Sequence, residues 1–207
     1  PGYRREGLVF AEFVQRTGAG ESLSMADSGA SFASADQGEL RMTGAALDLA
    51  LEGEGFFQTR SADGPLLTRA GAFQRSPEGL LVTSDGRPVL DTGGGTIFLP
   101  PDAASVSVAV DGTLSVDGAA QAQLGVVTAP PETLTRVGGT AFAPTEGVEP
   151  VAAPRIRQGA LELSNVGPVE EIARMIAVGR AYQQAQTLIS DEDERLRETV
   201  RKLGQPA

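Results

Sequence analysis

Acidic residues are the side chains in this sequence that come closest to forming a catalytic group. Glu52 and Glu54 are separated by one residue, and four consecutive carboxylates occupy 191–194. Two carboxyl groups held at a fixed separation across a cleft hydrolyse glycosidic bonds. Here the first pair lies in a Gly-rich turn and the run lies in a helical pattern, where acidic residues are normally solvated. We therefore expect no glycosidase site at either place.

The other motifs that could bind or react with a ligand are incomplete. The triple glycine at 93–95 lacks the lysine and the following helix of a phosphate-binding loop. Asp111 and Asp117, each followed by Gly, lack the spacing of a calcium-binding loop. The chain has no His and no Cys, so it has no residues for a Ser-His-Asp triad, a disulfide, or an imidazole or thiolate metal site. We expect no catalytic residue, no cofactor and no metal site.

The overall charge narrows the possible partners. The formal net charge is −10. Binding to nucleic acid or to an anionic membrane surface needs clustered Lys and Arg, so neither is an expected partner. No apolar run reaches the roughly 18–20 residues that span a bilayer, and no cleavable signal peptide is evident. We expect no direct insertion into a membrane.

The elements that must position these residues are mostly short strands. Between 47 and 160, apolar stretches alternate with turns, several of them Asp-Gly pairs such as Asp111-Gly112. Glycine tolerates the positive φ that tight hairpins require, so this spacing predicts a small antiparallel β domain. Residues 1–20 contain a short apolar run that fits a strand or a helix, and 21–46, rich in Ser, Ala and Gly, reads as an extended linker.

The last part of the chain, 161–207, predicts one long helix. Ser164, Asn165 or Gly167 is a candidate N-cap, and Pro168 suits the first turn, where a missing N–H costs nothing. Glu170 and the following Glu lie where the helix dipole favours negative charge. No further Pro and no obvious stop occurs before Gly204, so we expect a helix over 168–203, about 54 Å long at about 1.5 Å per residue. The fold class is mainly β with a long C-terminal helix.

That helix carries an apolar pattern with no visible partner. Met175, Tyr182, Ile189 and Leu196 recur every seven residues, and Ile172 begins a patchier companion stripe. A seven-residue repeat favours coiled-coil packing, and the sequence shows no second long helix that could cover the stripe. We expect the partner to lie outside the visible sequence.

Four segments resemble, in order, the motifs of the flagellar rod and hook protein family. They are LDLALEGEGFFQT, LLTRAGAFQ, LLVTSDGRPVL and LELSNVGPVEEIARMIAVGRAYQ, and the initial PGYRR resembles the end of the family's N-terminal motif. The resemblance implies an axial structural protein whose terminal helices pack as a coiled coil in a tube core, with a β-rich domain outside. Its N-terminal helix is then absent from this chain.

The resemblance also assigns residues to fold and assembly, none of them catalytic. The first set belongs to the C-terminal motif and helix and is expected in subunit packing: Leu163, Ser164, Asn165, Val166, Glu170, Ile172, Met175, Ile176, Arg180, Tyr182, Ile189 and Leu196. The second set belongs to the β-domain motif: Gly53, Gly55, Phe56, Phe57, Arg69, Gly71 and Phe73. The implied organisation is an N-terminal segment and linker (1–46), a β-rich domain (47–160) and a helix of the axial core (161–207).

Within the family, the Asp-Gly-rich middle and the long C-terminus resemble the proximal-rod type. Such proteins are exported without a cleaved signal and build the periplasmic drive shaft that transmits motor torque to the hook. The implied partners are further copies and other rod subunits, with the inner-membrane ring and the distal rod as further candidates. The alternatives are a distal-rod or hook paralogue, or, from another class, an extracellular β-rich binding module on a helical stalk.

Overall fold

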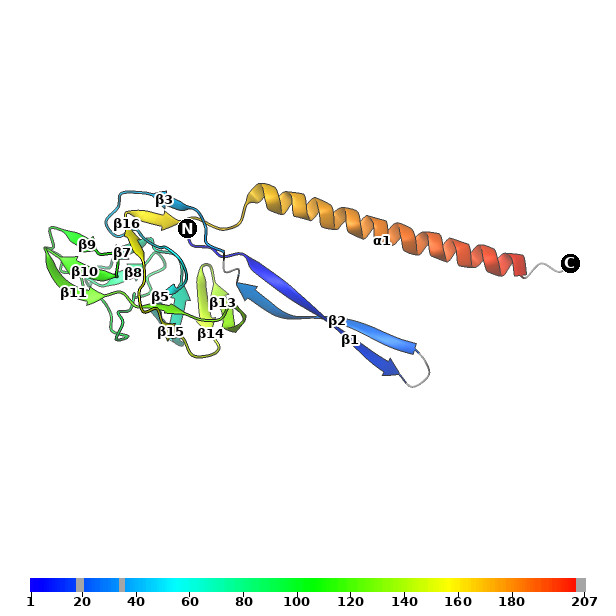
Figure 1. Cartoon of the computed structure of the whole chain (residues 1–207), viewed down its shortest axis with the longest axis horizontal. Coiled ribbons are helices and arrows are strands. Elements are labelled where there is room, and N and C mark those ends of the chain that lie inside the picture. The colour runs from blue at the N-terminus through cyan, green and yellow to red at the C-terminus, as the bar shows by residue number, and fades with distance from the viewer. Residues whose placement is uncertain (18–20, 34–35, 204–207) are drawn as a thin grey trace. The chain divides into compact units, whose positions relative to one another are not determined.

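The computed structural model describes residues 1–17, 21–33 and 36–203. The chain divides into two compact units, Pro1–Asn165 and Val166–Ala207. The first, which we call the β unit, is built from antiparallel strands, and the second contains the single α-helix among the described residues (Figure 1). The predicted fold class, mainly β with a long C-terminal helix, is confirmed.

A six-stranded antiparallel sheet forms the centre of the β unit. Its strand order is β13-β14-β6-β5-β12-β15. The strands in that order are Leu134–Gly138, Ala141–Pro144, Gly64–Thr68, Phe56–Ser61, Val126–Thr128 and Glu149–Pro150. A short 3-10 turn, η1 (Pro131–Thr133), precedes β13.

Smaller sheets complete the unit. A three-stranded sheet has the order β11-β10-β9, and four strand pairs are β1-β2, β16-β4, β17-β3 and β7-β8. Their bounds are β1 Glu6–Thr17, β2 Glu21–Ala33, β3 Leu40–Met42, β4 Leu49–Leu51, β7 Phe73–Arg75, β8 Leu81–Thr83, β9 Val106–Val108, β10 Thr113–Val116, β11 Ala119–Gln123, β16 Ile156–Gln158 and β17 Ala160–Glu162.

Adjacent residues of the central strands belong to two different apolar clusters. Phe57 and Val126 belong to a large cluster, whereas their neighbours Phe56 and Val127 belong to a smaller one. Successive side chains of a strand point to opposite faces of the sheet, so this split shows that the central sheet is covered on both faces. The Phe-Phe pair is therefore buried on two sides of one strand.

The Asp-Gly turns lie where the sequence predicts them. Asp117 has φ 50° and Gly118 has φ 83°, which together turn the chain between β10 and β11. Two consecutive positive φ values suit a tight hairpin because they match the twist of the flanking strands. β11 itself has the sequence AAQAQ, which carries no strand signal; pairing with β10 rather than side-chain propensity decides its structure.

The N-terminal part differs from the expected linker. Residues 21–33 form β2, which pairs antiparallel with β1 from Glu6↔Ala33 to Thr17↔Glu21 (Figure 1). The small and polar residues of β2 gave no strand signal, and its ladder depends on a partner strand with more apolar residues. At the other end, β17 takes Leu161 and Glu162 into a strand, so the helical region begins later than 161.

The helix α1 spans Pro168–Leu203, the range that the sequence predicts. Its first intrahelical hydrogen bond runs from the Glu171 N–H to the Gly167 carbonyl at 3.0 Å. Gly167 is therefore the N-cap residue, and the missing N–H of Pro168 falls where no helical partner exists.

Candidate assembly site

Three charged side chains meet inside the β unit and form what we call the ionic cluster: Arg4, Arg69 and Glu162. Glu162 Oε1 lies 3.3 Å from Arg4 Nη2, and Oε2 lies 3.2 Å from Arg69 Nη1. Each side chain is only 2 % exposed. The Gly38 N–H also donates to Glu162 Oε1, at 3.1 Å, and Arg69 Nη2 donates to the Gly53 carbonyl at 2.6 Å. The cluster thus joins segments that are far apart in the sequence.

Burial dominates the electrostatics of this cluster. Burial and then the positive charge of Arg4 lower the pKa of Arg69 to about 10, while Glu162 opposes the shift. Burial likewise lowers the pKa of Arg4, against the opposing effects of Glu162 and Asp36. Glu162 pairs with both buried guanidinium groups, and the charges of Asp36 and Glu54 also favour the charged forms of Arg4 and Arg69, respectively.

The first residues of the chain are packed into the β unit. The Gly2 N–H donates to the Glu162 carbonyl at 2.7 Å. Gly2 has φ +68°, and a Cβ there would lie 2.4 Å from the Ala70 nitrogen, so only glycine fits. The Arg136 guanidinium lies 4.4 Å from the centre of the Tyr3 ring and 4.6 Å from that of Phe142, a cation–π sandwich. The initial segment is therefore an integral part of this unit.

Asn165, a candidate N-cap in the sequence, has a different role in the structure. Its Oδ1 accepts from the Arg5 N–H at 2.7 Å, and its Nδ2 donates to the Asp36 carbonyl at 3.0 Å. Its own N–H donates to the Tyr3 carbonyl at 3.3 Å. The side chain thus bridges the initial segment and the chain returning after β2.

The β-domain motif residues lie partly beside the ionic cluster and partly in the large apolar cluster. Gly53 accepts the Arg69 hydrogen bond, and the Arg69 guanidinium lies 5.4 Å from the centre of the Phe56 ring. The Phe57 and Phe73 rings pack edge to face at 5.1 Å in the large apolar cluster.

The two other glycines of the motif allow close packing. At Gly71 a Cβ would lie 1.6 Å from the Leu49 carbonyl oxygen. Gly55 has φ +116°, and a Cβ there would lie 3.0 Å from the Val126 side chain. Neither position accepts a side chain without movement of its neighbours.

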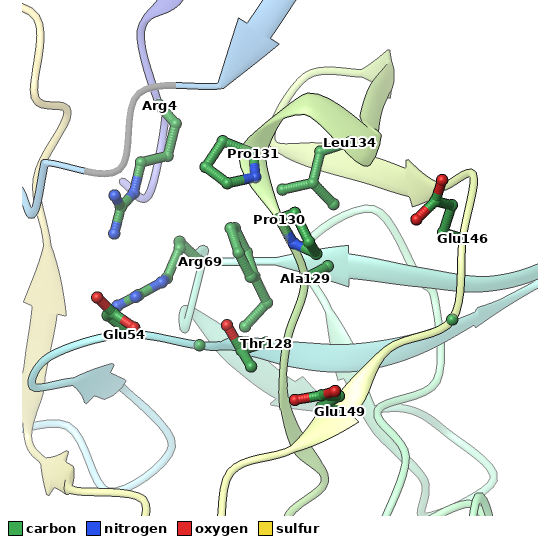
Figure 2. Close-up of a pocket in the computed structure, with 13 residues that line it drawn as sticks. Arg4, Glu54, Arg69, Thr128, Ala129, Pro130, Pro131, Leu134, Glu146 and Glu149 are labelled. Carbon is green, nitrogen blue, oxygen red and sulfur yellow. The ribbon is translucent and has the colours of Figure 1, made fainter.

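A cavity of about 480 Å³ opens beside the ionic cluster (Figure 2). Its wall is partly apolar, and Figure 2 shows Glu54 beside the Arg69 guanidinium, with Glu146 and Glu149 on the stretch of chain that leads into β15. The guanidinium groups that reach it are already paired with Glu162. The lining residues are Arg4, Glu54, Gly55, Phe56, Arg69, Thr128, Ala129, Pro130, Pro131, Leu134, Glu146, Gly147 and Glu149.

The helix exposes its apolar side chains. Met175 is 74 % exposed, Tyr182 65 % and Ile189 70 %. Exposed aliphatic and aromatic side chains along one helix mark a surface for another protein segment. The full set of large apolar side chains exposed on α1, among those described, is Val169, Ile172, Met175, Ile176, Val178, Tyr182, Leu188, Ile189 and Leu196.

The remaining residues of the C-terminal motif lie just before α1 and in its first half. The Leu163 N–H donates to the Glu39 carbonyl at 2.8 Å, which continues the pairing of β17 with β3. Leu163 and Val166 are half-buried, whereas Ser164, Glu170 and Arg180 are exposed. The structure therefore brings Leu163 and Asn165 into the β unit and leaves the α1 residues on a surface.

Sequence reasoning missed four residues of this region: Tyr3, Arg4, Arg136 and Glu162. Only tertiary pairing brings them together, so no local spacing could have revealed the cluster. One signal was available, since Glu162 lies between Leu161 and Leu163 in an apolar stretch. A carboxylate in such a position is seldom buried without a cationic partner.

Neither a metal site nor a membrane-spanning helix is found in the described part of the chain. Within 1–17, 21–33 and 36–203, no group of three or more acidic residues could hold a metal ion. Across the same residues, no helix is both long and apolar enough to cross a membrane.

Two family models match this chain. The model of the flagellar hook protein FlgE/F/G D1 domain covers residues 50–116, and that of the flagellar basal body rod FlgEFG protein C-terminal region covers 157–201. The matched ranges include Arg69, Glu162 and Asn165 together with most of α1. Neither model describes an enzyme.

Curated relatives extend the similarity over most of the chain. The flagellar basal-body rod protein FlgF of Caulobacter vibrioides is 38 % identical over 81 % of this chain and 70 % of its own length. FlgF of Mesorhizobium japonicum is 33 % identical over 98 % of this chain and 86 % of its own. FlgG of Bacillus subtilis is 34 % identical, covering 96 % and 86 %. The chain belongs to the family of flagellar basal-body rod proteins.

Proposed function

We propose that this protein is a structural subunit of the flagellar rod, of the proximal FlgF type. Membership of the rod family supports the structural role, and the similarity to FlgF proteins of two organisms supports the subtype. A distal-rod FlgG role is the alternative, because FlgG of Bacillus subtilis is similar over nearly the same length. The proposed location is the periplasmic part of the basal body, reached by export without a cleaved signal.

The exposed apolar side chains of α1 are the observation that carries the assembly proposal. Nine large apolar side chains of this one helix are exposed, each at 51 % or more. An isolated helix gains little stability in water, so such a helix needs a packing partner. We propose that Ile172, Met175, Tyr182, Ile189 and Leu196 pack against helices of other copies and other rod subunits in the axial core.

The β unit has a separate part in this proposal. Gly53, Phe56, Arg69 and Gly71 maintain the packing around the ionic cluster, so we assign them to the fold that presents the helix rather than to contacts between subunits. We keep the division into 1–46, 47–160 and 161–207 as the functional organisation, with torque entering the chain through the last part. The inner-membrane ring and the distal rod are the proposed neighbours at the two ends of the proximal rod.

A deletion and localisation experiment tests this proposal. Removal of the gene from the source organism should abolish swimming, and the wild-type gene should restore it. Cryo-electron microscopy of purified basal bodies should then place the subunit at the inner-membrane end of the rod. Density at the distal end would support the FlgG alternative, and unimpaired swimming of the deletion strain would contradict a rod function.

A further inference from the structure

The chain leaves the compact part of the β unit at three places that meet at one side chain. It leaves toward β1 after Arg5, returns from β2 at Asp36, and continues to α1 after Asn165. Arg5 and Asp36 form what we call the hairpin neck. The Asn165 side chain is hydrogen bonded to both neck residues, at 2.7 Å and 3.0 Å. The Asn165 carboxamide therefore links the two neck residues, and it lies three residues before α1 begins at Pro168.

The chemistry of the neck requires a carboxamide. One partner is an N–H, which needs an acceptor, and the other is a carbonyl, which needs a donor. A side-chain amide presents one of each on the same carbon, whereas a carboxylate presents only acceptors. Aspartate at position 165 would keep the bond from Arg5 but would place an oxygen against the Asp36 carbonyl.

The backbone around Asn165 is also held in place by hydrogen bonds to other segments. Its backbone N–H donates to the Tyr3 carbonyl, and the Leu163 N–H donates to the Glu39 carbonyl. Three residues upstream, Glu162 is buried between Arg4 and Arg69. Because these contacts fix the backbone, the Asn165 side chain keeps its hydrogen-bonding groups in place, as a positioning residue must.

We infer that Asn165 is a positioning residue that ties the hairpin neck to the chain segment that leads into α1. A force on the helix then passes at Asn165 into three chain segments rather than into a single strand. The origin of that force in assembly or rotation rests on the proposed rod function, whereas the tie itself is a property of the isolated protein.

Hydrogen exchange at the Arg5 amide tests the tie. N165A removes the acceptor, and loss of one hydrogen bond should speed exchange at this amide about tenfold. N165D keeps an acceptor, so exchange should stay within about threefold of wild type. Unchanged exchange in N165A would overturn the inference.

Q158A is the matched control, because the Gln158 amide also bridges backbone groups. It donates to Ala46 and Val106 carbonyls at 2.8 and 3.0 Å and accepts from the Val108 N–H at 3.2 Å, away from the neck. It should leave Arg5 exchange unchanged. Equal acceleration in Q158A and N165A would show a general loss of stability and would also overturn the tie.

Swimming of the complemented deletion strain tests the link to function. The wild-type gene and Q158A should restore swimming, while N165A and N165D should both fail, since each opens the Asp36 side of the neck. Failure of the wild-type gene would contradict the rod function itself. Full restoration by N165A or N165D, beside a functional wild type, would contradict only the positioning role.

Discussion

Arg4 and Glu162 form an ion pair between the initial segment and the last strand of the β unit. Their side chains approach to 3.3 Å, and each is 2 % exposed. Because Glu162 also pairs with Arg69, its carboxylate is shared by two buried guanidinium groups. The free energy of this arrangement depends on Glu162 more than on either arginine.

Replacement of Glu162 by Gln should strongly destabilise the β unit. It removes the counter-charge of two buried guanidinium groups, a loss of about 3–5 kcal/mol in the free energy of unfolding. Urea denaturation measures it. The control is Glu52→Gln, which breaks an exposed ion pair with Arg157 and should cost at most about 1 kcal/mol. A similar small cost for both variants would mean that the cluster contributes little.

Replacement of Gly71 by Ala should also destabilise this unit. The new Cβ would lie 1.6 Å from the Leu49 carbonyl oxygen, so the backbone of β4 must move, at a cost of about 3 kcal/mol or more. Gly147→Ala is the control, because no atom lies within 4 Å of its Cβ position. Thermal unfolding of the two variants compares them, and equal midpoints would contradict the close approach.

A charge on the apolar side of α1 should block assembly without unfolding the protein. Met175 is 74 % exposed, so Met175→Glu should change the free energy of unfolding by no more than about 0.5 kcal/mol. It should nevertheless abolish incorporation into basal bodies, since a buried unpaired carboxylate is strongly unfavourable. Gln184→Glu, on the opposite side of the helix, is the control. Normal incorporation of Met175→Glu would show that this side stays in solvent.

Protonation of the Asp85 carboxyl should lower the free energy of unfolding at low pH. Burial acts to raise the pKa of Asp85, but hydrogen bonds from Thr83 and Arg87 and the charge of Arg87 hold it below its ordinary 3.8. A carboxyl group with a lowered pKa in the folded state stabilises the fold at pH values above its pKa in the unfolded state. This stability is lost as the pH falls through the pKa of the folded state. The stability advantage of wild type over Asp85→Asn should therefore shrink below about pH 4. An advantage that stays constant from pH 6 to pH 2 would contradict this role.

The sequence predicted the elements whose signals are local. Pro168 and the uninterrupted run to Leu203 defined α1, and the Asp-Gly pairs defined hairpin turns. Both signals act through the conformation of the residues that carry them, so no distant contact was needed.

Elements that depend on distant contacts escaped prediction. β2 and β11 are rich in small and polar residues and become strands through their partners. The ionic cluster had the same origin, because Arg4 and Glu162 meet only after the sheets have formed. The β-domain motif supplied Arg69 and Gly53 through resemblance, without revealing that one donates a hydrogen bond to the other.

We propose that α1 completes its folding in the assembled rod. Hydrogen exchange of the amides of 168–203 in the isolated protein and in purified basal bodies tests it directly. A solvent-exposed helix without packing partners is marginally stable, so these amides should exchange at least about 100-fold faster in the isolated protein. Equal and strong protection of this helix in a monomer would contradict the account.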